Sequence, residues 1–168
     1  RFEHEELPAM KDDRRMFWRE ELLRIAGRET GDTGTRARTL ADTLSGQMLE
    51  RIEARYAKAS PEQLEEMRVE ARAIAEVSQG ERLQTARRLE QGITDRLLEG
   101  SGKRALKKAE RGRDFEDDLV IMHREIPAAS TEALTALRDT LRASQHADRF
   151  ANELRLIESE LQRRTTPP

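Results

Sequence analysis

Hydrophobic residues recur at helical spacing along almost the whole chain. Between residues 36 and 58 the apolar side chains fall every four residues, at Leu40, Leu44, Met48, Ile52 and Tyr56. This spacing places them on one face of an α-helix, whereas a half-buried strand would alternate every second residue. Comparable patterns cover residues 9–29, 61–99, 103–126 and 130–164. The sequence therefore predicts an all-α protein with about five helices.

The segment 61–99 is expected to form a long central helix. Its start, Ser60-Pro61-Glu62-Gln63, combines an N-cap, a proline at the first helical position and a capping-box glutamine. We interpret Gly100-Ser101-Gly102 as the linker that ends it. At about 1.5 Å per residue such a helix would be roughly 60 Å long, unless it bends or breaks at Gly80 or Gly92.

Two short connections indicate how the helices pair. Residues 59–61 form one, and the other follows Pro127, which ends a helix at the residue before it, with Ser130 as the next N-cap. Short connections favour antiparallel neighbours, so 103–164 is predicted to form a C-terminal, coiled-coil-like antiparallel hairpin. The expected fold is an elongated bundle in one domain, 1–168, with a candidate subdivision into a three-helix part, 9–99, and the hairpin, 103–164.

The composition indicates a thin core and a charged surface. Of the 168 residues, 38% are charged and 36% are hydrophobic, so charge covers much of each helix. Lys and Arg total 31 against 33 Asp and Glu, which is not the high net charge of a disordered chain. Thin apolar stripes bury more surface when helices associate, so we expect a protein partner or a homo-oligomer.

The sequence lacks the residues that several kinds of functional site require. The absence of cysteine excludes disulfides, thiolate metal sites and cysteine nucleophiles. His4, His123 and His146 are isolated, and none has a second histidine four residues away, so zincin and di-iron spacings are absent. We therefore predict no metal, cofactor, small-molecule ligand or catalytic residue, and interpret the protein as a non-enzyme. A site assembled from residues distant in sequence stays open.

No apolar run approaches the roughly 20 residues that span a bilayer, so no membrane span is expected. The cytoplasm is the default location. Because the chain begins at Arg1 rather than at a methionine, a processed N-terminus stays open.

One segment, 103–113, carries most of the local positive charge. Its cations are Lys103, Arg104, Lys107, Lys108, Arg111 and Arg113. Such a row could follow a phosphate backbone, which makes the segment a candidate contact for nucleic acid. The alternative is that the acidic residues at 114–118, which follow at once, make the segment half of a charge-segregated helix. That helix would pair with acidic neighbours such as Glu62, Glu65 and Glu66. No aromatic residue is interleaved for base stacking, and the net charge is −2, so we favour the second interpretation.

Met16-Phe17-Trp18 is the densest group of large apolar residues. Consecutive helical residues cannot all face one core, so one side chain either points to solvent or meets a second neighbour. We take Phe17 and Trp18 as candidate partner anchors, because exposed aromatic residues are typical of interface hot spots. The functional hypothesis is a non-enzymatic helical scaffold or adaptor. The alternative is a nucleic-acid-associated helical protein that uses residues 103–113.

Overall fold

The computed structural model describes residues 12–166, and within this range the chain is helical and contains no strand. The all-α prediction is confirmed, but the described chain has seven α-helices instead of about five. They are α2 (Asp12–Arg28), α3 (Asp32–Arg55), α4 (Pro61–Ala75), α5 (Gly80–Glu110), α6 (Glu116–Glu125), α7 (Thr131–Ala143) and α8 (Ala151–Thr165). Two 3-10 turns, η2 (Tyr56–Lys58) and η3 (Ala147–Phe150), follow α3 and precede α8.

The helices form two compact units. Unit 1 comprises Arg1–Lys58 and Val69–Leu89, and unit 2 comprises Ala59–Arg68 and Glu90–Pro168. Both α4 and α5 therefore contribute residues to each unit. The proposed subdivision at 9–99 and 103–164 stays a prediction.

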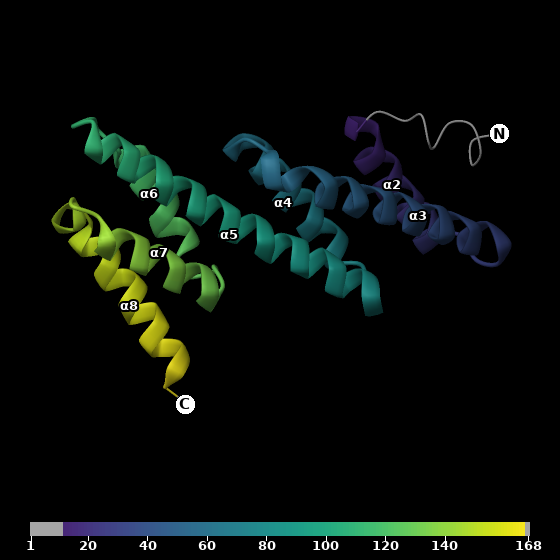
Figure 1. Cartoon of the computed structure of the whole chain (residues 1–168). Helices are drawn as coiled ribbons and strands as arrows, with labels where there is room; N and C mark the ends of the chain where they lie inside the picture. The colour runs from purple at the N-terminus through teal and green to yellow at the C-terminus, as the bar shows by residue number, and fades with distance from the viewer. Residues whose placement is uncertain (1–11, 167–168) are drawn as a thin grey trace. The chain divides into compact units, whose positions relative to one another are not determined.

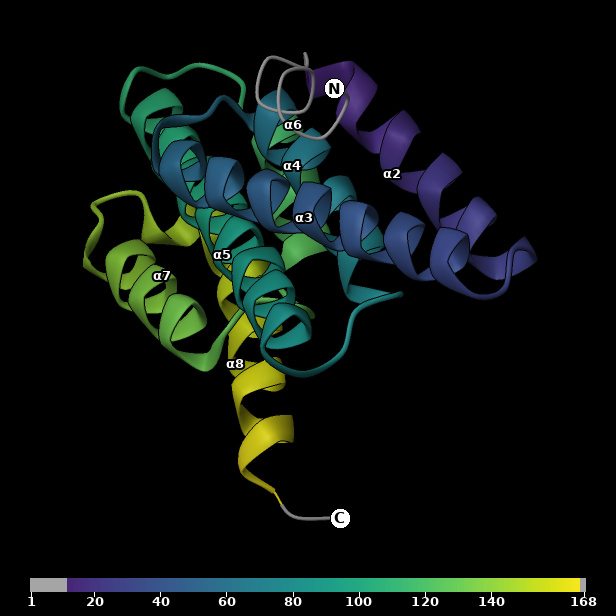
Figure 2. The ribbon, with the colours of Figure 1, turned by 90° about the vertical axis from the view of Figure 1, so that its right-hand side faces the viewer.

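In unit 1, α2 lies along α3, as Figures 1 and 2 show. Arg19 of α2 is fully buried, and its Nε donates to Ser45 Oγ of α3 at 2.9 Å. Its Nη2 donates to the backbone oxygen of Ala73 in α4 at 2.8 Å. Burial lowers the pKa of Arg19, because desolvation disfavours the charged guanidinium. One buried cation thus joins three helices.

The same arginine explains where the predicted helix 61–99 is interrupted. After α4 ends at Ala75, the Val77 N–H bonds to Ile74 O in a tighter turn. Arg19 then supplies a donor to Ala73 O, a carbonyl in the last turn of the helix. The next helix begins at Gly80, whose φ of 58° is the left-handed conformation that glycine adopts without strain. The long predicted helix is therefore two helices.

The predicted linker at 100–102 is wrong, because α5 continues through it. Ser101 is buried, and its hydroxyl donates to Leu98 O at 2.9 Å within the helix. Gly102 is buried too, and a Cβ at this position would overlap the Leu137 Cδ1 methyl of α7. Glycine is therefore used here for close helix packing and not for a chain break.

The predicted helix 103–126 is also interrupted, at Gly112. The Arg113 N–H bonds to Lys108 O at 2.8 Å, and the Gly112 N–H bonds to Ala109 O at 3.1 Å. With Gly112 at a φ of 61°, these bonds form a Schellman cap that ends α5. Residues 103–110 therefore belong to α5, and the chain starts again as α6.

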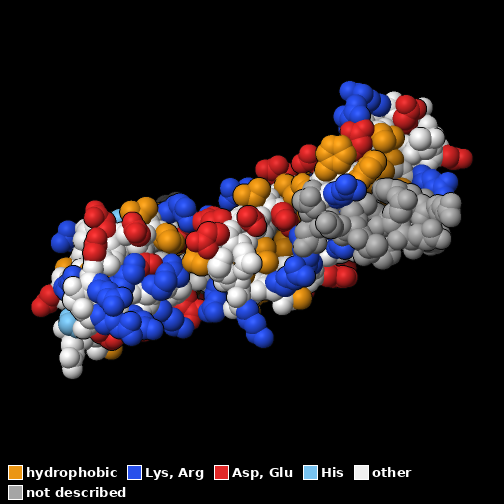
Figure 3. Space-filling model, turned by 90° about the horizontal axis from the view of Figure 1, so that it is seen from above, with side chains coloured by type: hydrophobic (Ala, Val, Ile, Leu, Met, Phe, Trp, Pro, Cys, Tyr) orange, Lys and Arg blue, Asp and Glu red, His pale blue; other side chains and the backbone are white. Residues whose placement is uncertain are grey.

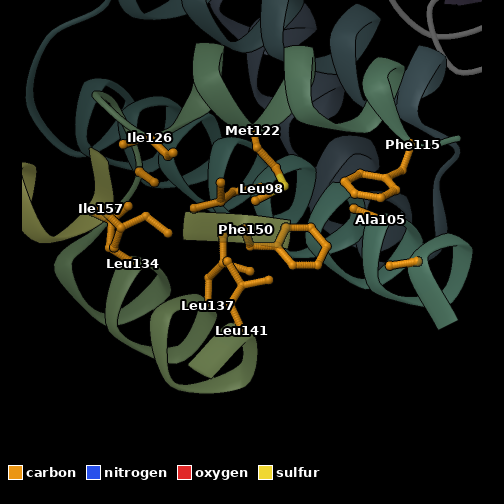
Figure 4. Close-up of a cluster of buried hydrophobic side chains, with 12 residues drawn as sticks. Leu98, Ala105, Phe115, Met122, Ile126, Leu134, Leu137, Leu141, Phe150 and Ile157 are labelled. Atoms are coloured by element: carbon orange, nitrogen blue, oxygen red, sulfur yellow. The ribbon is translucent and has the colours of Figure 1, made fainter. Parts of the chain in front are cut away.

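The fifth predicted helix, 130–164, is likewise two helices, α7 and α8. Leu141 and Phe150 are nine residues apart, so one continuous helix would place them on opposite faces. Ser144, in extended conformation with φ −75° and ψ 143°, breaks the helix, and both side chains reach one core. Figure 4 shows that core, in which Phe115 and Phe150 stack with their ring centroids 5.1 Å apart. The single hairpin expected over 103–164 is replaced by the end of α5, α6, α7, η3 and α8.

The close contact at Gly102 can be tested with two alanine substitutions. Alanine favours helix over glycine by about 1 kcal/mol, so Gly46→Ala in α3, where a Cβ meets open space, should raise the free energy of unfolding. Gly102→Ala should lower it by about 1–2 kcal/mol, because Leu137 must move within a packed core. Urea denaturation measures both variants. Stabilisation by both substitutions would contradict the packing of α7 on α5.

Candidate interaction surfaces

The two predicted partner anchors differ in exposure. Phe17 is 61% exposed on α2, whereas Trp18 is half-buried against the apolar cluster between α2 and α3. Their rings meet edge to face, with centroids 5.7 Å apart. Trp18 therefore belongs largely to the fold of unit 1, and Phe17 presents a large apolar side chain to solvent.

Exposed groups of both charge signs lie close to Phe17 along α2. Arg14 and Glu20 are exposed and lie one turn before and after it. One turn further, Arg24 Nε donates to Glu21 Oε2 at 2.9 Å. The surface around Phe17 therefore carries no excess of one charge sign.

The structure divides the basic segment 103–113 into paired and unpaired cations. Lys103 pairs with Glu99 one turn earlier. Arg104 Nε and Lys108 Nζ lie 2.7 Å and 2.8 Å from the two carboxylate oxygens of Asp118. Lys107, Arg111 and Arg113 are exposed and have no hydrogen-bond or ion-pair partner among the side chains that the structure describes. Figure 3 shows Lys and Arg side chains gathered over this end of α5.

Asp118 is the counterion of this segment, and its side chain is only 5% exposed. The Schellman cap at Gly112 turns the chain, and the first turn of α6 then lies beside α5. Asp118 is one of the four acidic residues in the stretch 114–118, and it is the one that is buried. Three of the six cations are thus ion-paired, but their partners are Glu99 and Asp118 and not the predicted Glu62, Glu65 and Glu66.

Of the predicted partners Glu62, Glu65 and Glu66, Glu65 lies in a different network. Its carboxylate binds Arg68 of α4 and Arg124 of α6. Both arginines also bind Glu125, whose side chain is 1% exposed. Burial opposes the charged form of Arg68, but the hydrogen bonds and charges of Glu125 and Glu65 together outweigh it and raise the pKa of Arg68. These four charges join α4 to α6 inside unit 2.

The two histidines that the structure describes lie in different surroundings. His123 Nε2 lies 2.7 Å from Oε1 of the buried Glu153, which links α6 to α8, while His146 lies in the turn after α7. His4 falls outside the described residues. Within residues 12–166 no three His, Asp or Glu side chains are placed to hold a metal ion. No helix of the described chain is both long and apolar enough to cross a membrane.

Each unit has a surface groove. In unit 1 a groove of about 420 Å³ runs between α3 and the start of α5, and its carboxylates are Glu50, Glu53 and Glu81. In unit 2 a groove of about 790 Å³ lies between the end of α5 and the end of α7. The unit 2 groove is lined by Leu106, Glu110, Thr140, Ala143, Ser144, Gln145 and His146.

The chain was compared with protein-family models, with curated protein sequences and with solved structures. No match was found in any of the three.

The Glu125 network gives a stability test. Glu125→Ala leaves Arg68 and Arg124 without their buried carboxylate and should lower the free energy of unfolding by about 3 kcal/mol or more. The matched variant Glu65→Ala removes the more exposed carboxylate from the same arginines and should cost about 1 kcal/mol or less. Urea unfolding monitored by circular dichroism measures both. Equal losses would contradict the burial of Glu125.

Proposed function

We propose that this chain is a non-enzymatic helical scaffold or adaptor that acts through protein–protein contacts, with α2 as its principal contact surface. The observation that carries the proposal is Phe17, which is 61% exposed on a helix whose opposite face is packed against α3. Large exposed aromatic side chains are common anchors of protein interfaces, because they bury much apolar area at small entropic cost.

Unit 1 exposes two further large apolar side chains. Val69 on α4 and Val77 in the turn after it are 66% and 56% exposed. Together with Phe17 they leave apolar area of unit 1 in contact with water. Association would bury part of that area, and each Å² of apolar surface removed from water stabilises the complex by about 25 cal/mol.

A second copy of the chain can bind to this surface without charge repulsion. In a two-fold contact the same patch faces itself, so a patch with one charge sign would repel its copy. Around Phe17 the charges are mixed, with Arg14 and Arg24 beside Glu20 and Glu21. We therefore expect the chain to self-assemble through α2, and this expectation can be tested directly.

The alternative, nucleic-acid binding by residues 103–113, has less support. Three of the six cations are paired with acidic side chains, and two of these share the buried Asp118. Unit 2 contains 15 Lys and Arg residues against 18 Asp and Glu residues, a difference of −3. A negative unit with few unpaired cations gains little from the counterion release that drives binding to a phosphate backbone.

Self-assembly predicts a concentration-dependent mass in sedimentation velocity. Phe17→Ala should weaken the association by about tenfold or more, because truncation of a hot-spot residue costs at least about 1.4 kcal/mol. Val120→Ala is the matched control, since Val120 is 63% exposed but lies on α6 in unit 2. Its association should equal that of the unaltered chain.

Both variants remove an exposed side chain, so their thermal unfolding should remain close to that of the unaltered chain. A chain that stays monomeric at the highest soluble concentration would overturn self-assembly. Equal weakening by Phe17→Ala and Val120→Ala would remove α2 from the interface.

A further inference from the structure

Three carboxylates are buried in unit 2, and each of them joins two helices. The side chains of Asp118, Glu125 and Glu153 are 5%, 1% and 4% exposed. A carboxylate that is removed from water needs a partner that offsets its lost hydration. The kind of partner therefore decides under which conditions each of these helix contacts is stable.

Two of the three carboxylates have partners that stay charged. Each of the two receives two cations, which are Arg104 and Lys108 for Asp118 and Arg68 and Arg124 for Glu125. Guanidinium and ammonium groups keep their charge well above neutral pH. These two contacts between helices are therefore insensitive to a change of pH near neutrality.

Glu153 differs from the other two because its partner is a histidine. His123 Nε2 of α6 lies 2.7 Å from Glu153 Oε1 of α8, and neither side chain makes another hydrogen bond or ion pair within residues 12–166. Histidine is the side chain that ordinarily gains or loses its charge between about pH 5 and 8. The counter-charge of Glu153 is thus present only while the imidazole is protonated.

No charged neighbour on α6 is available to replace His123. Arg124, the next residue, is bound to Glu65 and Glu125. The positions one turn to either side of His123 carry no ionisable group, and they are occupied by Leu119, Val120, Ile126 and Pro127. The only charge that α6 offers to Glu153 at this point is therefore that of the imidazolium.

The cations of the other helices in unit 2 are also engaged or directed elsewhere. Arg149, just before α8, donates to Ala109 O at 3.3 Å and lies over the ring of Phe115. Arg155 follows Glu153 by two residues, which places it on the opposite side of α8. Further acidic side chains hold the remaining neighbours: Asp118 binds Arg104 and Lys108 of α5, Glu158 binds Arg142 of α7, and Glu160 binds Arg163 and Arg164.

The His123–Glu153 pair fastens the start of α8 to α6. Glu153 lies in the first turn of α8, and Phe150 and Ile157, one turn before and after it, are buried in the core of unit 2. The His123 side chain is 40% exposed, so its ring can exchange a proton with water while the helices stay packed. Loss of that proton leaves Glu153 with a neutral hydrogen bond, which is weaker than a charge-assisted one.

We propose that His123 and Glu153 form a pH-sensitive latch that holds α8 on unit 2. While the pair carries its proton, an imidazolium meets the buried carboxylate and α8 is docked. As the pH rises, the proton passes to water, the stabilisation is lost and α8 separates from the core more often. The latch lies in unit 2 and does not depend on self-assembly through α2.

Urea unfolding at about pH 5.5 and about pH 8.5 tests the latch with two variants. His123→Arg supplies a cation that does not titrate in this range, and Glu153→Gln removes the carboxylate. Between the two pH values the unfolding equilibrium constant of the unaltered chain should rise by about tenfold relative to that of either variant. An equal change in the unaltered chain and in either variant would overturn the proposal.

His146→Gln is the matched control, because it removes the other histidine of the described residues and leaves the latch intact. Its unfolding should depend on pH as that of the unaltered chain does. Loss of the pH dependence in His146→Gln would assign the effect to the turn after α7 and would contradict the latch.

Amide hydrogen exchange shows whether the effect is centred on α8. Protection factors of the amides in Ala151–Thr165 should fall by about tenfold between the two pH values, whereas those in the middle of α5 should change little. In His123→Arg the amides of α8 should keep their protection at the higher pH. An equal fall in α5 and α8 of the unaltered chain would show a general loss of stability instead of a latch on one helix.

Discussion

The structure depends on close approach between helices that have little apolar surface to bury. Small residues make this approach possible on α5, where Gly102 contacts Leu137 and the buried Ala105 and Ala109 continue the same face. Dispersion and burial then act over a wide contact area, although each residue contributes little. Because α7 must follow this narrow face and then turn away at Ser144, the groove of unit 2 is a consequence of the same packing.

In this fold buried charged side chains join neighbouring helices, as larger apolar side chains do in other proteins. Arg19 joins α2, α3 and α4, Glu125 receives two arginines, and Asp118 receives the cations of Arg104 and Lys108. An ion pair in a protein interior stabilises little relative to apolar residues of equal size, but removal of one partner is costly. These buried charges therefore determine which helices pack together. The cations that remain without an acidic partner determine the charge of the surface.

The helix starts could be predicted from sequence because each is a local signal. Ser60 and Gln63 form the reciprocal capping box, and the Ala133 N–H donates to Ser130 Oγ.

The interruptions between helices were harder to predict, because glycine has two uses. Gly80 and Gly112 adopt positive φ values and separate helices, whereas Gly102 lies inside a helix and admits a neighbour. Only the tertiary contact with Leu137 distinguishes these uses. The break between Leu141 and Phe150 was visible in the sequence as a half-turn shift of the apolar stripe. The exposure of Phe17 and the buried position of Asp118 could be recognised only from the three-dimensional structure.

Amide hydrogen exchange across residues 98–104 of the intact chain tests the central claim most directly. If α5 is one helix whose Gly102 packs against α7, these amides are held in a continuous hydrogen-bonded ladder and exchange slowly. They should be far better protected than the amides of the turn at 76–79, which serves as the internal reference. Exchange at 100–102 as fast as in that turn would show a linker instead of a helix, and would contradict both the packing of α7 on α5 and the groove that follows from it.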